Sequence, residues 1–213
     1  MADAVYTQAR NLPLPPSSSV SSRTYIVTGA NTGLGLFAAQ NLALLGAARV
    51  ILAVRNVTAG EAAKKQIDVA VAAAGGADVK VEVWYLDLSV FESIKAFVKR
   101  VEAELETVDG LIENAAVAAG GDERAEGYRL TVAVNVVGTL LLGVLMVPVM
   151  GRKAREGETP RVVVVTSRVG FDGREAWEGF GGEVMKGMEG VEGIQLWVLF
   201  LPSVPLFGVL AFF

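Results

Sequence analysis

Residues 28–35, with the sequence Thr-Gly-Ala-Asn-Thr-Gly-Leu-Gly, decide the fold of this chain. They join a short run of β-forming residues to an apolar segment with helical spacing. Gly29 permits a tight turn after the strand, Gly33 lets the backbone approach a pyrophosphate, and Gly35 lets the helix pack closely on the sheet. The first turn of that helix offers free N–H groups and the positive end of its dipole to phosphates. The stretch therefore predicts a dinucleotide-binding turn, and a Gly-rich turn without a ligand is the alternative.

Strands and helices alternate from residue 23 to residue 166. The predicted strands are 24–28, 49–54, 79–86, 108–112 and 161–166, and the predicted helices are 33–45, 58–74, 89–105 and 128–150. The strands are apolar on both faces and are separated by helices, which indicates a parallel sheet covered on both sides. We therefore predict an α/β fold with a Rossmann-type, doubly wound parallel sheet in three layers, α/β/α, incomplete at its C-terminal edge.

Two helices are predicted to begin with a capping box, in which a hydroxyl and a carboxylate three residues later satisfy free N–H groups. Thr58 and Glu61 form the first box, and Ser89 and Glu92 form the second. The helix after Ser89 also has an apolar face that we expect to be buried, made of Phe91, Ile94, Phe97, Val98 and Val101.

The composition excludes several classes of function. The 213 residues carry a net charge of −4 and contain neither Cys nor His. An acidic chain has no basic field for nucleic acid, so no nucleic-acid partner is expected. Without Cys and His there are no disulfides, no thiolate or imidazole metal ligands and no His-based triads, and no metal site is predicted. Acid–base chemistry must therefore use Tyr, Lys, Asp, Glu or a bound cofactor.

The spacing Thr-Gly-x-x-x-Gly-x-Gly resembles that of the short-chain dehydrogenase/reductase family, and later motifs match the family in order as far as Gly170. Asp87, after the third strand, is similar to the family's Asp that holds the adenine. Asn114, in the segment Asn-Ala-Ala after the fourth strand, is similar to the turn beside the cofactor. Asn135 is similar to the helix Asn that anchors a proton-relay water, and Ser167 is similar to the catalytic Ser at a strand end.

Each of these matches has a structural alternative, such as a turn residue for Asp87 and for Asn114. Asn135 is the most telling, because an amide inside an apolar helix is costly unless it is hydrogen-bonded. The matches lie in order at strand carboxyl ends, where α/β sheets bind ligands, and together they favour the functional interpretation. The sequences of these motifs are similar to those of retinol dehydrogenase-like and protochlorophyllide reductase-like members, and also to those of reductases of fungal secondary metabolism.

The residue after the second strand bears on the choice of dinucleotide. NAD-selective sites place a carboxylate there, which bonds the ribose 2′-OH and repels a 2′-phosphate. In this chain the strand is followed by Arg55 and Asn56, and the first acid is Glu61. The planar guanidinium of Arg55 can bind a phosphate through two hydrogen bonds. We therefore predict NADP(H), with Asn31 and Arg55 near the 2′-phosphate, and the alternative is that Arg55 is a solvated charge.

The predicted cofactor contacts share a position at the carboxyl edge of the sheet: Thr28, Gly29, Asn31, Thr32, Gly33, Leu34, Gly35, Arg55, Asp87, Leu88, Asn114 and Ala115. The predicted catalytic side chains are Ser167, which would polarise the substrate oxygen, and Asn135. The resemblance implies hydride transfer between a nicotinamide and a carbonyl or alcohol carbon of a small-molecule substrate. It leaves open whether the chain forms a homo-oligomer.

The family's Tyr-x-x-x-Lys element is absent after Ser167. That element supplies a phenol that protonates or deprotonates the substrate oxygen, and a Lys that lowers the pKa of the phenol. No Tyr follows Ser167, the only later Lys is Lys186, and the last Tyr is Tyr128. We therefore expect an oxidoreductase by descent with little or no turnover. The alternative is a non-catalytic nucleotide-binding or partner-binding protein.

The chain is predicted to divide into four segments. Residues 1–22 form an irregular tail, 23–170 an NADP-binding domain, 171–193 a Gly- and charge-rich segment that resembles an insertion, and 194–213 an apolar tail. Three hypotheses compete for the apolar tail. We favour non-native coding appended to a C-terminally truncated family member, ahead of a replacement strand. A membrane-seeking end comes last, because two prolines interrupt the run.

Another uncharged stretch, 130–151, is explained better by a buried helix than by a membrane span. The N-terminus lacks the basic and then apolar layout of a secretory signal. We therefore expect a cytoplasmic protein.

Overall fold

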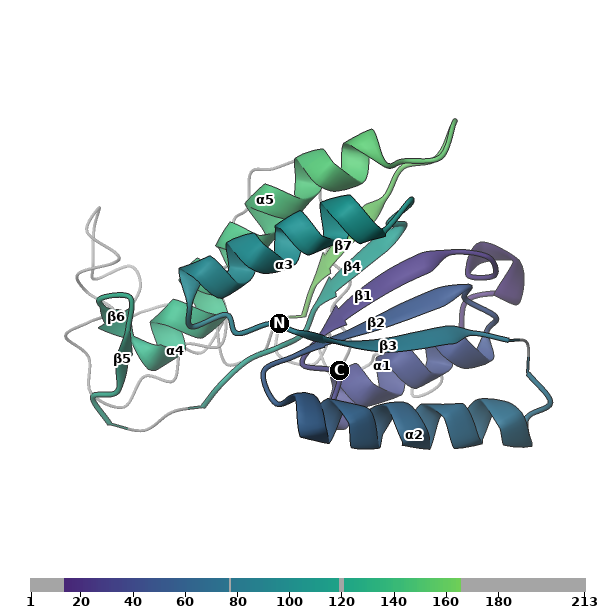
Figure 1. Ribbon diagram of the computed structural model, residues 1–213, viewed down its shortest axis with the longest axis horizontal. Helices are drawn as coiled ribbons and strands as arrows, with labels where there is room; N and C mark the ends of the chain where they lie inside the picture. Colours follow the sequence, from purple (N-terminus) through teal and green to yellow (C-terminus); the bar gives the residue numbers. More distant parts are fainter. Residues whose placement is uncertain (1–13, 77, 119–120, 166–213) are drawn as a thin grey trace, which may run out of the picture.

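The computed structural model describes residues 14–76, 78–118 and 121–165. Its centre is a sheet of five parallel strands in the order β3-β2-β1-β4-β7 (Figure 1). The strands are β1 (Thr24–Thr28), β2 (Arg49–Val54), β3 (Lys80–Tyr85), β4 (Gly110–Glu113) and β7 (Arg161–Val164). The predicted parallel sheet is confirmed, and within the described part of the chain β3 and β7 are its two edge strands.

Helices cover both faces of the sheet, which confirms the predicted three-layer, doubly wound architecture (Figure 1). One face carries α1 (Gly33–Leu44) and α2 (Val57–Ala73), and the other carries α3 (Phe91–Glu104) and α5 (Thr139–Arg152). Each interface has its own cluster of buried apolar side chains. The cluster under α3 and α5 includes Trp84, Phe97, Leu111, Leu142 and Met146, and the cluster under α1 and α2 includes Val27, Ala39, Val50 and Ile67.

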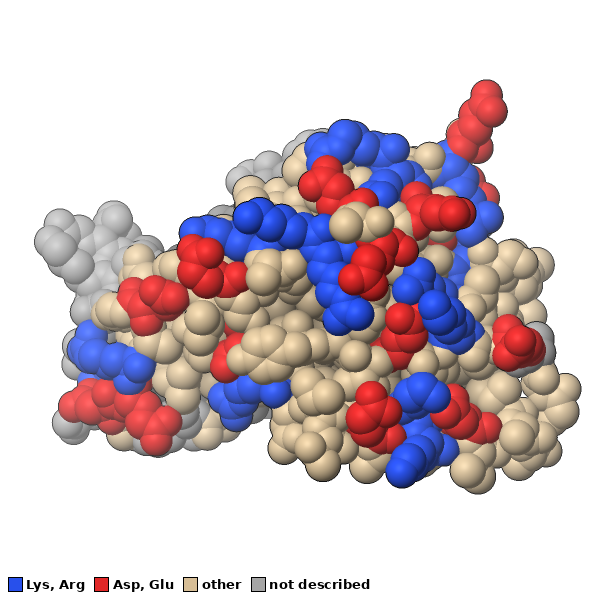
Figure 2. All heavy atoms as spheres, viewed as in Figure 1, with Lys and Arg blue, Asp and Glu red and all other residues tan. Residues whose placement is uncertain are grey.

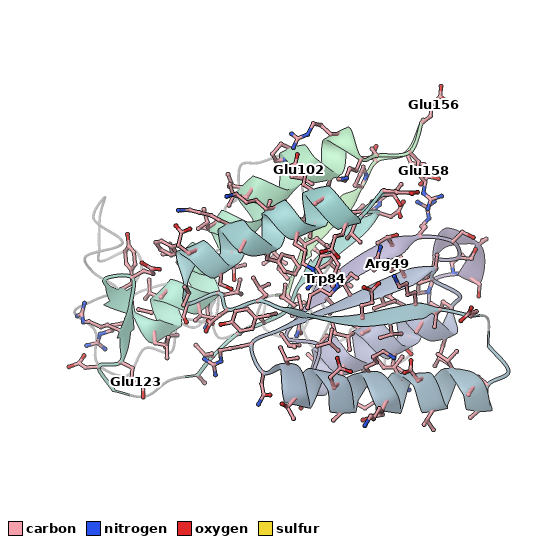
Figure 3. All side chains as sticks on the ribbon, in the orientation of Figure 1. Arg49, Trp84, Glu102, Glu123, Glu156 and Glu158 are labelled. Carbon is pink, nitrogen blue, oxygen red and sulfur yellow. The ribbon has the colours of Figure 1, made fainter. Side chains whose placement is uncertain are left out.

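The predicted face of α3 is buried except at Phe91, which is half-buried, and an aromatic pair anchors the helix to the sheet. The rings of Trp84 on β3 and Phe97 on α3 meet edge to face with centroids 5.9 Å apart. The guanidinium of Arg100 lies 3.9 Å from the Trp84 ring centroid. The guanidinium of Arg49 lies 5.9 Å from the same centroid, and Figure 3 labels Arg49 and Trp84. On the surface that carries α2 and α3, basic and acidic side chains are intermixed, with no field of one sign (Figure 2).

Both predicted capping boxes are wrong, because each helix begins at a residue other than the one expected. Helix α2 begins at Val57, and the Asn56 side chain accepts a hydrogen bond from the Ala59 N–H at 3.0 Å, so Thr58 lies inside the helix.

The cap of α3 comes from a distant part of the chain. The helix begins at Phe91. The Ser89 hydroxyl does not cap this helix, because it donates to the Asp87 carboxylate at 2.6 Å. The N–H of Phe91 donates to the carboxylate of Glu126 at 2.9 Å. A contact between residues 35 positions apart cannot be inferred from a local pattern.

The helix predicted over 128–150 begins later than expected. Tyr128 lies in a small hairpin of β5 (Arg124–Ala125) and β6 (Tyr128–Arg129). Its two turn residues, Glu126 and Gly127, have φ angles of 51° and 86°, the left-handed geometry that two-residue hairpins favour. The chain then forms α4 (Leu130–Val132), the π-helical segment η3 (Ala133–Gly138) and α5.

The helical run Leu130–Arg152 is long and apolar enough to cross a membrane by length and composition, and 44% of its most apolar window is buried. Leu142 and Met146 are fully buried in the cluster under α5, which supports the interpretation of this run as a core helix. Of the predicted N-terminal tail, residues 14–22 are described. They contain the 3-10 turn η2 (Ser17–Ser19) and the buried Val20. The segments predicted over 171–193 and 194–213 lie outside the described residues.

Candidate functional site

The sheet reverses its winding direction between β1 and β4. The connections after β1 lead through β2 to β3 on one side, whereas β4 is followed by β7 on the other. These two strands are adjacent, with Tyr25 to Val27 in register with Gly110 to Ile112. In open α/β sheets the crevice at such a switch point, outside the strand carboxyl ends, is where ligands bind. The stretch 28–35 and the segment starting at Asn114 both leave the sheet at this point.

Thr28 and Asn114 join the two strand ends. The buried Oγ1 of Thr28 accepts hydrogen bonds from the N–H groups of Asn114 and Ala115, each at 2.9 Å. In return, Nδ2 of Asn114 donates to the carbonyls of Thr28 at 3.1 Å and Gly29 at 3.5 Å. The side chains of Thr28 and Asn114 therefore bind the opposite strand end. The backbone of the turn is left to face the crevice.

The three glycines of the turn have different surroundings. A Cβ on Gly29 would lie 2.9 Å from Cα of Ala115, and one on Gly35 would lie 2.4 Å from Nδ2 of Asn114 and 2.6 Å from the Gly29 carbonyl oxygen. Gly33 has a φ of 55°, and a Cβ there would meet no described atom within 4 Å. Gly29 and Gly35 thus allow close packing, whereas Gly33 leaves an open surface of bare backbone.

The first turn of α1 lies at the same crevice. Its N-cap residue, Thr32, makes no side-chain capping hydrogen bond, and the turn contains no acidic residue. The first N–H groups of a helix have no partner within the helix. Thr32 and Leu34 are exposed and Asn31 is half-buried. Together with the open face of Gly33, these N–H groups fit a diphosphate.

Arg55 lies at the carboxyl end of β2, the strand next to β1. Its side chain is exposed and has no hydrogen bond or ion pair with the rest of the described chain. The nearest acid along the sequence, Glu61, is exposed on α2. A guanidinium that is not committed to an internal partner can bind an anion at this edge.

Asp87 makes the turn that leads from β3 into α3. Its Oδ1 accepts hydrogen bonds from the N–H of Ser89 at 2.9 Å and from the Ser89 hydroxyl, and its own N–H donates to Oγ of Ser93 at 2.9 Å. The next residue, Leu88, is buried, and a Cβ on Gly138 would lie 2.2 Å from its carbonyl oxygen. The turn after β3 is therefore packed directly against the π-helical segment that contains Asn135.

Both polar atoms of the Asn135 side chain are hydrogen-bonded. Its Oδ1 accepts from the N–H of Val117 at 2.8 Å, and its Nδ2 donates to the Val117 carbonyl at 2.9 Å. The residue holds the loop after β4 against the helix. π-helical segments often occur at functional sites, where they displace backbone groups from the regular ladder.

Ser167 lies outside the described residues. The last described residue, Val165, donates its N–H to the carbonyl of Glu113 at 2.9 Å, at the carboxyl end of β4. The predicted cofactor contacts all fall within the described residues, on the ends of β1, β2, β3 and β4 and the start of α1.

The sequence analysis missed one unusual group, the carboxyl of Glu113. This side chain ends β4, is 4% exposed, and faces the cluster under α5. Burial raises its pKa from the ordinary 4.5 to about 8. The signal in the sequence is an acid that ends the otherwise apolar strand Gly-Leu-Ile-Glu, where a side chain on this face is expected to be buried.

Comparisons with known proteins agree on one family. Residues 23–182 match the family model described as short chain dehydrogenase. The short chain dehydrogenase/reductase dmxR8 of Cryptosporiopsis is 38% identical over 164 residues, which are 76% of this chain and 49% of that protein. The short chain dehydrogenase sol3 of Alternaria solani is 39% identical over 75% of this chain and 54% of its own length. The chain thus spans about half the length of these curated relatives.

Solved structures agree with this match. The Escherichia coli oxidoreductase yciK is 25% identical, with a TM-score of 0.60 over 76% of this chain and 64% of that one. A protein of Escherichia coli CFT073 described as a short chain dehydrogenase and complexed with NADPH is 25% identical, with a TM-score of 0.60 over 81% of this chain and 68% of that one.

Proposed function

Since this chain belongs to the short-chain dehydrogenase/reductase family, we propose that its described part holds NADP(H) and that the protein serves hydride transfer between a nicotinamide and a carbonyl or alcohol carbon. The observation that carries the proposal is the junction of Thr28 with Asn114 and Ala115, which leaves Gly33 as bare backbone beside an uncapped helix start. The relative complexed with NADPH supports the nature of the nucleotide.

The proposed contacts follow from the chemistry at each strand end. The N–H groups at the start of α1, around Thr32 to Gly35, bind the diphosphate, and the open face of Gly33 allows the close approach. Arg55 and Asn31 take the 2′-phosphate, because Arg55 has no partner among the described residues and no carboxylate lies next to it in the sequence. Asp87 and Leu88 lie on the adenine side, and Asn114 and Ala115 lie on the nicotinamide side.

NADP(H), when bound, supplies or accepts the hydride. In the proposal, the hydroxyl of Ser167 donates a hydrogen bond to the substrate oxygen. Asn135 supports the proton relay, and its side chain is held in place by two hydrogen bonds with Val117. The 213 residues contain no Tyr-x-x-x-Lys after Ser167 to transfer the proton. General acid–base catalysis contributes about 10²–10⁴-fold, so we expect these 213 residues to show little or no turnover.

The second candidate function is nucleotide binding without catalysis. The observation that favours it is the same lack of a Tyr and a partner Lys after Ser167. Both candidates require a nucleotide, so binding is tested first. Titration of the 213-residue chain with NADPH and NADH should give the tighter dissociation constant for NADPH. Tighter NADH binding would contradict the choice of nucleotide, and no binding of either would contradict both functions.

Turnover then separates the two candidates. NADPH oxidation is followed with a panel of small ketones, aldehydes and quinones in the presence of the 213-residue chain. Binding without oxidation is the expected result and favours the binding function for this form. Robust NADPH-dependent reduction would show that another group transfers the proton and would overturn the expectation of inactivity.

A further inference from the structure

Glu113 is a buried acid that the proposed function does not use. Its side chain lies between the end of β4 and α5, where Gly143 leaves room for it. A Cβ on Gly143 would lie 3.4 Å from one carboxyl oxygen of Glu113 and 3.6 Å from the other. The carboxyl therefore lies against the helix backbone, and its Oε1 is buried with no hydrogen-bond partner within the described chain.

No charged side chain of the described residues faces this carboxyl. On β1, Tyr25 packs against the opposite face of the sheet. On β7, Arg161 is in register with Gly110, three residues before Glu113. On α5, the only charged residue is Arg152 at the far end, where it pairs with Glu102 of α3 (Figure 3 labels Glu102). Burial alone therefore acts on the carboxyl, and it raises the pKa to about 8.

The backbone of Glu113 leads directly into the candidate nucleotide site. Its carbonyl accepts from Val165 of the neighbouring chain segment, and the next residue, Asn114, makes the hydrogen bonds that fix Thr28 and Gly29. Ala115, one residue further, contacts Gly29. A displacement of the end of β4 would therefore move the turn that holds the nucleotide.

We propose that Glu113 is a positioning residue for the nucleotide site: as the neutral acid it allows the end of β4 to pack against α5, and loss of its proton displaces Asn114 and Ala115 from the β1–α1 turn. An unpaired carboxylate in an apolar core is strongly unfavourable. It gains stability by admitting water or by moving towards the edge of the sheet, and either change separates β4 from α5. The proton on Glu113 thereby couples pH to the shape of the crevice.

The consequence for binding rests on the proposed function. Below about pH 8 the carboxyl is neutral and the site is assembled. Above it, if the neutral form alone holds the turn, the dissociation constant for NADPH should rise by up to about tenfold per pH unit.

The experiment uses the 213-residue chain with ¹³C-labelled Glu and ¹⁵N-labelled backbone. It compares the wild type with E113Q and E113L, which keep the size of the side chain and cannot ionise. The control is E82Q on β3, because Glu82 is paired with Arg49 at 2.6 Å and Lys80 at 3.1 Å and its pKa is lowered. The carboxyl ¹³C shift of residue 113, the amide shifts of Asn114 and Ala115, and the NADPH dissociation constant are followed from pH 6 to pH 9.5.

The expected result is a carboxyl transition near pH 8, with amide shifts and a weakening of NADPH binding that follow it in the wild type and in E82Q. E113Q and E113L should lack all three changes. A carboxyl transition near pH 4.5 would overturn the inference. So would amide shifts of Asn114 and Ala115 that do not change over the pH range in which the carboxyl titrates. If the wild type binds no NADPH at any pH, the proposed function fails, and the amide shifts of Asn114 and Ala115 still decide whether Glu113 positions this turn.

Discussion

The side chain of Asn135 forms two hydrogen bonds with a single residue, Val117: it accepts from the N–H at 2.8 Å and donates to the carbonyl at 2.9 Å. An asparagine inside an apolar helix is thereby satisfied, and the loop after β4 is tied to the π-helical segment η3. From the sequence alone, an amide at position 135 in an apolar helix was expected to be unfavourable unless its side chain was hydrogen-bonded. The structure identifies the partner as a peptide group 18 residues earlier in the chain.

Replacement of Asn135 by Leu should therefore destabilise the protein. Both backbone groups of the half-buried Val117 lose their partner, and since an unsatisfied buried polar group costs about 1–3 kcal/mol, the loss should lie at or below that range. Urea unfolding measures the loss. N41L is a matched control, because Asn41 is half-buried on α1 and makes no side-chain hydrogen bond within the described residues. Equal stability of N135L and the wild type would show that the bonds to Val117 contribute nothing net.

Replacement of Thr28 by Val should open the junction between β1 and β4. The substitution keeps the shape of the side chain and removes the oxygen that accepts from the N–H groups of Asn114 and Ala115. We expect a loss of about 1–3 kcal/mol in unfolding free energy, together with weaker NADPH binding. T28S retains the hydroxyl and should keep both properties close to wild type. If T28V bound NADPH with the wild-type dissociation constant, the junction between β1 and β4 would not contribute to nucleotide binding.

Alanine at Gly33 and alanine at Gly35 should have different effects. At Gly35 it meets Nδ2 of Asn114 at 2.4 Å and the backbone of Gly29 at 2.6 Å, so G35A should be poorly folded. At Gly33 it meets nothing within 4 Å, and the cost is the left-handed φ of 55°, about 1–2 kcal/mol. G33A should therefore fold, yet bind NADPH at least about tenfold more weakly, because the new methyl projects where the phosphates approach. Thermal unfolding and NADPH titration measure the two effects, and tight binding by G33A would contradict the placement of the phosphates.

Replacement of Arg55 by Ala should remove the preference for NADPH over NADH. A charge-assisted hydrogen bond to a phosphate contributes about 1.5–3 kcal/mol, or about ten- to hundredfold in affinity, and NADH lacks that phosphate. The ratio of the two dissociation constants is the measurement. R152A is the control, because Arg152 is an exposed arginine at the end of α5. An unchanged ratio in R55A would assign the preference to another residue.

The acidic group Glu113 should make folding stability fall as pH rises from 4.5 to 8. Its pKa is higher in the folded state than the ordinary value, so the folded state binds more protons in this window. The contribution of Glu113 is therefore fully present below pH 4.5 and is lost by pH 8, at up to about 1.4 kcal/mol per pH unit. Urea unfolding at several pH values should show this slope in the wild type but not in E113Q. Parallel curves for the two proteins would mean that the carboxyl titrates normally.

Local patterns predicted the sheet well. Strands β1 and β2 have the predicted bounds, because a run of apolar, β-branched residues flanked by turn residues has few other ways to bury itself. The start of α1 was predicted correctly at Gly33. The starts of α2 and α3 were not, because neighbouring side chains compete with the expected caps Thr58 and Ser89. Asn56 caps α2, two residues before the expected cap Thr58, and the Ser89 hydroxyl bonds to Asp87. The hairpin at Glu126 was missed because an isolated two-strand turn has a weak local signal.

The Gly-rich stretch 28–35 and the alternation of strands with helices were sufficient to establish the α/β fold and the position of its crevice, because backbone geometry and apolar periodicity act over a few residues. Contacts between distant segments account for the rest. The bond from Asn114 to Thr28 spans 86 residues and the cap of Phe91 by Glu126 spans 35. The burial of Glu113 depends on α5 lying across β4 with Gly143 above it. The pKa of a carboxyl follows from the side chains packed around it, and a sequence lists neighbours along the chain but not neighbours in space.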